Sequence, residues 1–399
     1  MMEILTASWV LPIAAPPLRG GRVAVGDERV AGVGRDGDPG APDGPVRDLG
    51  PGVLLPGLVN AHCHLELSHL AGQLAGGRGF VPWVEDVVAS RGRFAEEAVR
   101  AATARAIREI EERGTVAVGD VSNGLGHLDL LAASRLSAVV FLELLAWDPA
   151  KAEATLGWAE ERASAVAGSL RPGLVVRLAA HAPHSVSPAL LRALVERGGP
   201  AAIHLAESPD ETAFLRNGSG GWPAFLEKRG LGHVAFSPPG ASPVRYLDGL
   251  GALHPRLVAA HGVQVDAVDR ETLARRGVHV VLCPRSNRAL GVGTADVPAL
   301  LAAGVRLALG TDSLASAPTL DVLDDAVLLH RQFPALDPAA ILRMATLGGA
   351  EALGVDDLGA IAPGKRAALT FAAAGAPPAD PAGFLLSGEA RLCPVEVVR

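Results

Sequence analysis

The sequence predicts an α/β fold, in which a (β/α)8 TIM barrel is joined to a small β-sandwich domain built from both chain termini. In residues 55–355 of the 399-residue chain, eight short apolar runs alternate with longer Ala-, Arg- and Glu-rich stretches. Strands that alternate with helices form parallel sheets, and eight such strands are typical of a closed barrel. Residues 1–54 and 356–399 instead contain short β-like runs, and in residues 1–54 Gly, Pro and Asp punctuate them.

Each predicted barrel strand is a short apolar run that ends near a polar residue. In chain order the runs are GLVNAHCHL, GTVAVGDV, SAVVFLELL, GLVVRLAAHA, AAIHLAE, RLVAAHGV, VHVVLCPRS and VRLALGTDS. The intervening segments with helical character include FAEEAVRAATARAIREIEERG, AEATLGWAEERASAVAGSL, SPALLRALVERG and DAVDRETLARRG. The N-terminal runs EILTASWVLPI, GRVAVGDERVAGVG and VRDLGPGVLLP predict a small antiparallel sheet with hairpin turns.

Composition narrows the class of protein. Hydrophobic residues make up 49% of the chain, enough for a large core, and the formal net charge is −7. There is no basic stripe of the kind that binds nucleic acid. No window approaches the roughly 18 apolar residues of a membrane span, and the N-terminus lacks the basic region of a secretory signal. Three scattered cysteines argue against a disulfide framework and predict a reducing, cytoplasmic location.

Residues that can bind metal fall at the ends of the predicted strands. Active sites of barrel enzymes are built at the carboxyl ends of the strands, so these side chains are expected to meet. They are His62 and His64 (first strand), His181 (fourth), His204 (fifth), His261 (sixth) and Asp312 (eighth). A single histidine at a strand end is most often structural, but a set at the same end of so many strands is not expected by chance.

The spacing of the first pair indicates its geometry. Residues i and i+2 of a strand share a face, so His62 and His64 can both point into the barrel mouth while Cys63 points away. Two histidines, a third histidine and a carboxylate form a site for which Zn²⁺ is the natural occupant, with Fe²⁺ as the alternative. The metal would lower the pKa of a bound water.

Glu207 and His261 add groups that can handle protons. Glu207 follows His204 by three residues just beyond a strand end, and a glutamate beside an activated water is a natural proton shuttle. If His62, His64, His204 and Asp312 bind the metal, His261 is free to orient the water, and Asp312 can also accept its proton. Asp210 and Glu211 are interpreted as solvated loop acids.

Lysine usage predicts a single metal ion. Two-metal barrel sites are often bridged by a carboxylated lysine at the end of a middle strand. Here the lysines are Lys151, Lys228 and Lys365, and none follows the fourth predicted strand.

The motifs PGLVNAHCHLELS, HLAES, AAHGV, CPRSN and GTDSLAS, taken in order, resemble the amidohydrolase superfamily over essentially the whole chain. The His-x-x-Glu element and the missing lysine resemble its mononuclear deaminase branch. That resemblance implies that His62, His64, His204 and Asp312 bind metal. It further implies that Glu207 protonates a ring nitrogen, while His261 and Asp312 handle the water.

Within that branch, HCHLELSHL followed by GFVPWVEDVV is most similar to aminodeoxyfutalosine deaminases of menaquinone biosynthesis. The expected reaction releases ammonia from an amino-substituted heterocycle. Trp83 can stack on a ring, and Glu66 and His181 can hydrogen-bond polar groups. A carboxylated substrate would need a cation, for which Arg285 is the first candidate and Arg288 the second.

Alternatives on the same scaffold are an S-adenosylhomocysteine or adenosine deaminase, a guanine or cytosine deaminase, and a triazine chlorohydrolase. Glu207 favours deamination over dehalogenation, because an amine leaving group needs a proton. A metal-binding protein without turnover is the alternative from another class, but it would leave Glu207 and His261 without a task. We expect a small-molecule substrate, no nucleic-acid or membrane partner, and a homodimer as one open oligomeric state.

Overall fold

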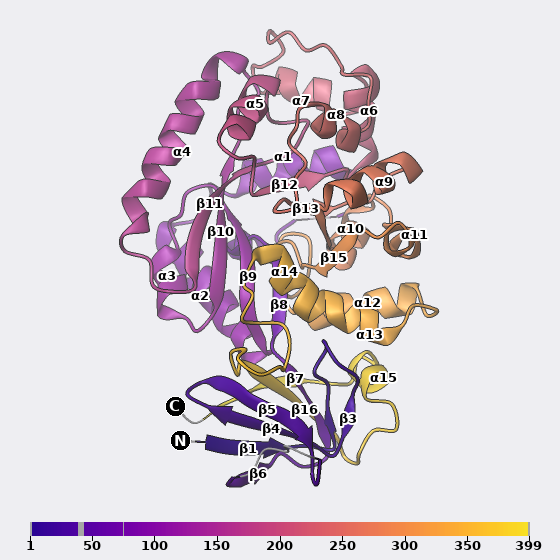
Figure 1. Ribbon diagram of the computed structural model, residues 1–399. Helices are drawn as coiled ribbons and strands as arrows, with labels where there is room; N and C mark the ends of the chain where they lie inside the picture. The colour runs from indigo at the N-terminus through magenta and orange to yellow at the C-terminus, as the bar shows by residue number, and fades with distance from the viewer. Residues whose placement is uncertain (1, 39–43, 75, 398–399) are drawn as a thin grey trace.

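The computed structural model describes residues 2–38, 44–74 and 76–397 (Figure 1). Its centre is built from eight parallel strands, and each corresponds to one of the predicted apolar runs. They are β8 (Leu58–Cys63), β9 (Thr115–Ser122), β10 (Ser137–Leu144), β11 (Leu174–Ala180), β12 (Ala202–Leu205), β13 (Val258–His261), β14 (His279–Leu282) and β15 (Arg306–Leu309). The predicted strand order is therefore confirmed.

The eight strands form two four-stranded parallel sheets that meet at both edges. One sheet has the order β11-β10-β9-β8 and the other β12-β13-β14-β15. Just beyond β11, His181 O accepts from His204 N of β12 at 2.8 Å. At the other edge, His62 O of β8 accepts from Thr311 N, just beyond β15, at 3.0 Å. The strands thus close into a ring, as the sequence predicts, and the chain has the (β/α)8 barrel fold.

Helices follow the strands and cover the outside of the ring (Figure 1). They are α1 (Phe80–Ser90), α2 (Glu96–Glu112), α3 (Leu128–Ala133), α4 (Ala152–Ala167), α5 (Pro188–Glu196), α6 (Pro209–Asn217), α7 (Trp222–Lys228), α8 (Pro243–Gly249), α9 (Ala267–Arg276), α10 (Pro284–Leu290), α11 (Val297–Ala302), α12 (Val322–Gln332), α13 (Pro338–Arg343) and α14 (Gly349–Leu353). Short helical turns span Leu65–Leu70, Pro149–Lys151 and Met344–Gly348. None of the helices in the described ranges is both long and apolar enough to span a bilayer.

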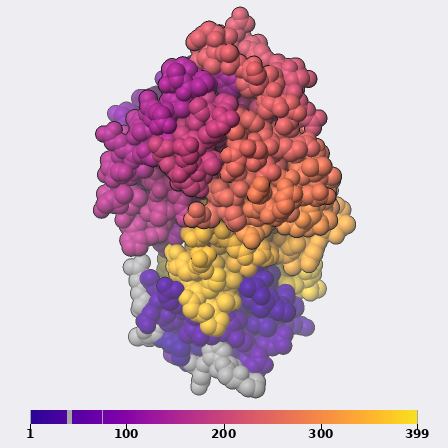
Figure 2. All heavy atoms as spheres, turned by 45° about the horizontal axis from the view of Figure 1, so that its top comes forward, coloured from indigo at the N-terminus to yellow at the C-terminus, as the bar shows by residue number. Residues whose placement is uncertain are grey.

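The two chain ends form a second β unit below the barrel, where the indigo N-terminal and yellow C-terminal residues pack together (Figures 1 and 2). Its sheets have the orders β5-β4-β1-β6 and β17-β16-β7-β2-β3. The strands are β1 (Met2–Thr6), β2 (Trp9–Val10), β3 (Leu18–Arg19), β4 (Gly21–Gly26), β5 (Arg29–Arg35), β6 (Val46–Asp48), β7 (Gly52–Pro56), β16 (Leu369–Ala373) and β17 (Leu392–Val395), with α15 (Pro381–Leu385) between the last two.

This β unit differs from the prediction in two respects. The N-terminal pairings are not all antiparallel, because β1 pairs with β6 and β2 with β7 in parallel. Parallel partners need a crossover rather than a hairpin, and here the β4–β5 hairpin lies within the connection from β1 to β6. In addition, β7 runs to Pro56 and β8 starts at Leu58, so the strands change from one unit to the other at Gly57 rather than after residue 54.

A close backbone approach positions the site where β15 meets β8. A Cβ added at Gly310 would lie 2.8 Å from both the Cβ and the carbonyl oxygen of His62, closer than side-chain contacts allow. Glycine therefore lets the chain pass directly over His62 before it reaches Asp312. The close contact between Gly310 and His62 therefore brings Asp312, which follows β15, near the histidine of β8.

Candidate active site

The histidines and the aspartate predicted to bind metal come together at the carboxyl ends of the barrel strands. One ring nitrogen each of His62, His64 and His204 lies within 4.8 Å of the others. His64 Nε2 is 3.1 Å from His204 Nε2 and 3.6 Å from Asp312 Oδ1. All four residues are buried or nearly so. Cys63, between the two histidines, packs in the hydrophobic core behind the strand instead.

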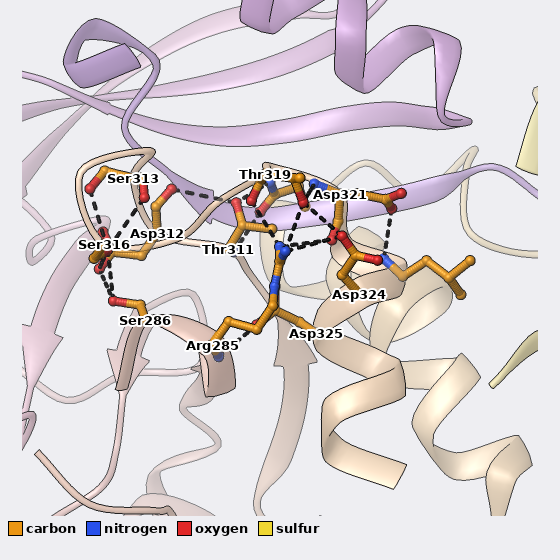
Figure 3. Close-up of polar contacts among 12 residues, drawn as sticks. Arg285, Ser286, Thr311, Asp312, Ser313, Ser316, Thr319, Asp321, Asp324 and Asp325 are labelled. Carbon is orange, nitrogen blue, oxygen red and sulfur yellow. Dashed lines mark hydrogen bonds and ion pairs between the residues drawn. The ribbon is translucent and has the colours of Figure 1, made fainter. Parts of the chain in front are cut away.

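His204 and Asp312 each use one polar atom in hydrogen bonds on the side away from the cluster. The other polar atom of each side chain is left to bind a metal. His204 Nδ1 donates to the carbonyl oxygen of His181 at 2.9 Å, so His204 Nε2 is the atom available to a metal. Asp312 Oδ2 accepts from Ser286 Oγ at 2.5 Å and from Ser316 Oγ at 3.1 Å (Figure 3). Its other oxygen, Oδ1, is the one that lies near His64. Such outer partners orient metal ligands and fix their tautomers.

An orphaned nitrogen supports a metal at this place. His62 Nε2 is buried and has no hydrogen-bond partner among the described residues. A buried ring nitrogen without a partner is costly, and a metal ion would satisfy it. Three imidazoles and one carboxylate fit a borderline divalent ion such as Zn²⁺. The donor set therefore forms a cluster able to hold a metal.

The charge states of these side chains also suit metal binding. Burial, together with the neighbouring imidazoles, holds the pKa of His62 well below its ordinary value, and burial lowers that of His64 to about 3. Both rings are therefore neutral at pH 7, as metal ligands must be. Burial opposes ionisation of Asp312, but His64, His261 and the Ser286 hydrogen bond outweigh it and its pKa is lowered. Asp312 is thus an anionic oxygen donor.

A second group, on the same side of the barrel, can move protons. One ligand atom each of Glu207, His261 and Asp312 lies within 4.8 Å of the others, and His261 Nε2 is 3.6 Å from Glu207 Oε2. His261 Nδ1 is bonded to Asn287 Oδ1 at 2.9 Å, so its Nε2 faces the site. Burial and the carboxylates of Asp312 and Glu211 raise the pKa of Glu207 well above its ordinary value. Glu207 is therefore suited to donate a proton.

The backbone is held in an unusual conformation at this group. Ala206, His261 and Asp312 have φ values of 52°, 76° and 60°, a left-handed conformation that non-glycine residues seldom adopt. Strain of this kind persists only where surrounding contacts hold it, and it is concentrated at functional sites. Here the three residues end or closely follow β12, β13 and β15, at the carboxyl ends of the barrel strands.

Glu211 is not the solvated loop acid that the sequence suggested. It is fully buried, and its carboxylate accepts from Ala206 N at 3.1 Å and from Glu207 N at 2.8 Å. Burial nevertheless raises its pKa to about 7. Because α6 begins at Pro209 with Ser208 as its N-cap, Glu211 lies in the first turn of the helix and folds back to hold the loop that carries Glu207. The contact is local, and the Ser-x-x-Glu spacing of Ser208 and Glu211, typical of a helix N-terminus, was a signal for it in the sequence.

The predicted substrate contacts Glu66, Trp83 and His181 line a cavity that opens onto the metal-ligand cluster. Trp83 comes from α1 and lies near Phe80, with 6.2 Å between ring centroids. Glu66 is not fully free, because its carboxylate accepts from Ser122 Oγ at 2.9 Å and from Asn123 N at 3.0 Å. His181 Nδ1 is bonded to Ser185 Oγ at 2.5 Å.

Arg285 does not take part in the cavity, and the expected contact with a substrate carboxylate is not supported. All five guanidinium N–H groups are used within the protein (Figure 3). The Nε atom donates to Asp325 Oδ2 at 2.8 Å, while the two terminal nitrogens donate to Asp324 and Thr319 and to two backbone carbonyls. The position of Arg285 near the end of a strand suggested a contact with substrate, but its guanidinium group points toward α12.

The cavity-lining residues that the sequence did not predict include Arg91, Asn123 and Glu143. Asn123 joins them, since its Oδ1 accepts from Arg91 at 3.2 Å and its Nδ2 donates to Glu143 Oε2 at 2.8 Å. Asn123 and Glu143 lie at the carboxyl ends of the second and third barrel strands. A polar residue at the carboxyl end of a predicted barrel strand was the sequence signal for both.

Comparison with known proteins agrees with this geometry. Residues 53–391 match the model of the amidohydrolase family. The chain belongs to the amidohydrolase family. It is a hydrolase of the kind that acts on C–N bonds.

Particular relatives are deaminases. The chain is 39% identical over 314 residues to an aminodeoxyfutalosine deaminase from Deinococcus radiodurans, covering 76% of this chain and 73% of that protein. Its structure is similar to Helicobacter pylori aminofutalosine deaminase in complex with methylthio-coformycin (TM-score 0.82, 25% identity, 98% and 97% of the chains covered). It is also similar to an adenosine deaminase from Xanthomonas campestris with bound zinc (TM-score 0.79, 28% identity, 98% and 89% covered).

Proposed function

We propose that this protein deaminates an adenine nucleoside hydrolytically, with aminodeoxyfutalosine as the first candidate substrate. The observation that carries the proposal is the proton-handling group, in which Glu207 Oε2 lies 3.6 Å from His261 Nε2 beside the metal-ligand cluster. A non-catalytic metal-binding protein has no use for this second group. Chloride leaves without a proton, whereas an amine leaving group needs one, so a group able to handle two protons favours deamination over dehalogenation.

The residues divide the chemistry between them. His62, His64, His204 and Asp312 would hold one divalent ion, Zn²⁺ first and Fe²⁺ as the alternative. When bound, the ion supplies Lewis-acid activation of water. Water adds to the ring carbon that bears the amino group, while Glu207 protonates the adjacent ring nitrogen. Asp312 accepts one proton of the water, which His261 orients. That proton passes on to the amine, the hydroxyl group of the adduct returns its proton to Glu207, and ammonia leaves as the carbonyl forms.

Substrate recognition falls to the rest of the cavity. Trp83 offers an aromatic face to a ring, and Glu66 and His181 lie at the polar side. For a carboxylated substrate the cation is Arg91 rather than Arg285, because Arg91 is the lysine or arginine that lines the cavity within the described chain. Arg91 is exposed, and its guanidinium group donates to Asn123 Oδ1 at 3.2 Å.

The test is ammonia release from a panel containing aminodeoxyfutalosine, adenosine, S-adenosylhomocysteine, guanine and cytosine, with protein loaded with Zn²⁺ or Fe²⁺. The Glu207→Gln variant should retain metal and lose roughly 10²–10⁴-fold in kcat. Glu196→Gln, at the exposed end of α5, is the matched control and should behave as wild type. Metal-loaded protein that is silent on every compound would contradict the proposal, as would a Glu207→Gln variant of wild-type rate.

Two further expectations stay predictions. A homodimer is checked by size-exclusion chromatography with light scattering, and the cytoplasmic location by fractionation of the source cells. Neither enters the proposed chemistry.

A further inference from the structure

Glu143 lines the active-site cavity and has a carboxylate oxygen that no described residue uses. It is the last acidic residue of β10, is only 7% exposed and lines the cavity. Its Oε2 accepts from Asn123 Nδ2 at 2.8 Å. Its Oε1 is buried and accepts no hydrogen bond from any described residue. An unpaired buried carboxylate oxygen costs free energy, and in a binding site it marks where a ligand donor belongs.

The neighbouring histidine does not fill this role. His204 Nδ1 is 3.5 Å from Glu143 Oε1, but its N–H points to the carbonyl oxygen of His181 at 2.9 Å. The same contact argues against a second metal ion among Glu143, His181 and His204, although their ligand atoms lie within 4.8 Å of one another. The Nδ1 atom that such an ion would need is already a donor.

The chemistry of the substrate indicates which donor Oε1 meets. Glu143 lies on the Nδ1 side of His204, whereas the metal-ligand cluster faces its Nε2. It is therefore separated from the reacting edge of the base. Away from that edge, an adenine ring substituted at its glycosidic nitrogen carries only acceptor nitrogens. A carboxylate there has no partner on the base, and the donors left in a nucleoside are the sugar hydroxyls.

We propose that Glu143 accepts a hydrogen bond from a ribose hydroxyl of the substrate, so that the site selects ribonucleosides over deoxynucleosides and free bases. This inference rests on the proposed deaminase function and extends it to the sugar. Asn123 donates to Oε2 and thereby holds the carboxylate with Oε1 unpaired, which makes Asn123 a positioning residue for the same contact.

The experiment measures kcat/KM for adenosine, 2′-deoxyadenosine and 3′-deoxyadenosine with zinc-loaded wild type, Glu143→Ala and Glu143→Gln. A hydrogen bond to a charged group corresponds to about a 10–100-fold preference for adenosine over one deoxy analogue. Glu143→Ala should reduce that preference to within about twofold while zinc content stays unchanged. Glu143→Gln keeps the shape of the side chain if the alanine variant fails to fold, and should reduce the preference in part.

An equal loss of activity on adenosine and both deoxy analogues would overturn the inference, because a residue that only positions His204 would act on every substrate alike. Loss of zinc in both variants would overturn it for the same reason. If wild type releases no ammonia from any nucleoside, the proposed function fails, and calorimetric binding of the three compounds decides the inference. Equal affinity for all three, or no binding, then overturns it as well.

Discussion

Replacing Arg285 with alanine should destabilise the protein without changing how it recognises substrate. The side chain is 7% exposed and pairs with Asp325, which is fully buried, at 2.8 Å. Removing one partner of a buried ion pair leaves an uncompensated charge and costs about 3–5 kcal/mol. The same loss should appear in the free energy of unfolding measured by urea titration with tryptophan fluorescence.

The destabilisation should also depend on pH. Burial raises the pKa of Asp325 to about 6 even with Arg285 beside it. A folded pKa above the unfolded value means that stability is greatest at low pH and declines as pH rises through the folded pKa. Loss of Arg285 would raise this pKa by a further ~2–4 units, since 3–5 kcal/mol corresponds to that shift at 1.36 kcal/mol per unit.

The free energies of unfolding of wild type and Arg285→Ala should therefore diverge above about pH 6. The difference should grow by roughly 1.4 kcal/mol per pH unit, or about 2.7 kcal/mol between pH 6 and pH 8. Arg288→Ala, exposed on the same helix, is the control and should follow wild type. A destabilisation that is equal at both pH values would refute the electrostatic reasoning. A large rise in KM with unchanged stability would show instead that Arg285 binds substrate.

Three other substitutions test the rest of the site. Ser286→Ala removes the 2.5 Å donor to Asp312 Oδ2 and should weaken metal binding about 10–100-fold, measured by competition with a chromophoric chelator. Trp83→Ala should raise KM about 5–10-fold, as expected for loss of a ring contact worth roughly 1 kcal/mol, with little change in thermal midpoint; an unchanged KM would mean the ring only packs on Phe80. Arg91→Gln should raise KM at least about 10-fold for a carboxylated nucleoside but not for adenosine, and equal effects on both would argue against a carboxylate contact.

Local patterns in the sequence carried the fold and the centre of the site. The period of each apolar run specifies a strand, and eight runs alternating with helical segments leave few topologies other than a parallel barrel. That topology then fixes which ends of the strands meet. The i, i+2 spacing of His62 and His64 is sufficient to orient both rings to one face, which is why the histidine cluster could be assembled from residues far apart in the chain.

Contacts between distant side chains decided the remainder. Arg285 follows β14, and Glu143 lies near the end of β10. The sequence does not show that Arg285 donates five hydrogen bonds within the protein, whereas Glu143 keeps one carboxylate oxygen without a partner among the described residues. Glu211 is a different case, because its contact with the backbone N–H of Glu207 is local. The acid lies in the first turn of α6, three residues after the N-cap Ser208, a spacing typical of a helix N-terminus.

The physical reason is that strand and helix periodicity depends on neighbours along the chain, whereas the partner of a polar group depends on which groups the closed barrel brings within about 3 Å of it. The sequence by itself therefore determined the barrel, its order and the inward-facing histidines. Only the tertiary structure decided which charged groups are paired within the protein, which backbone residues are strained and which polar atoms are left for a ligand.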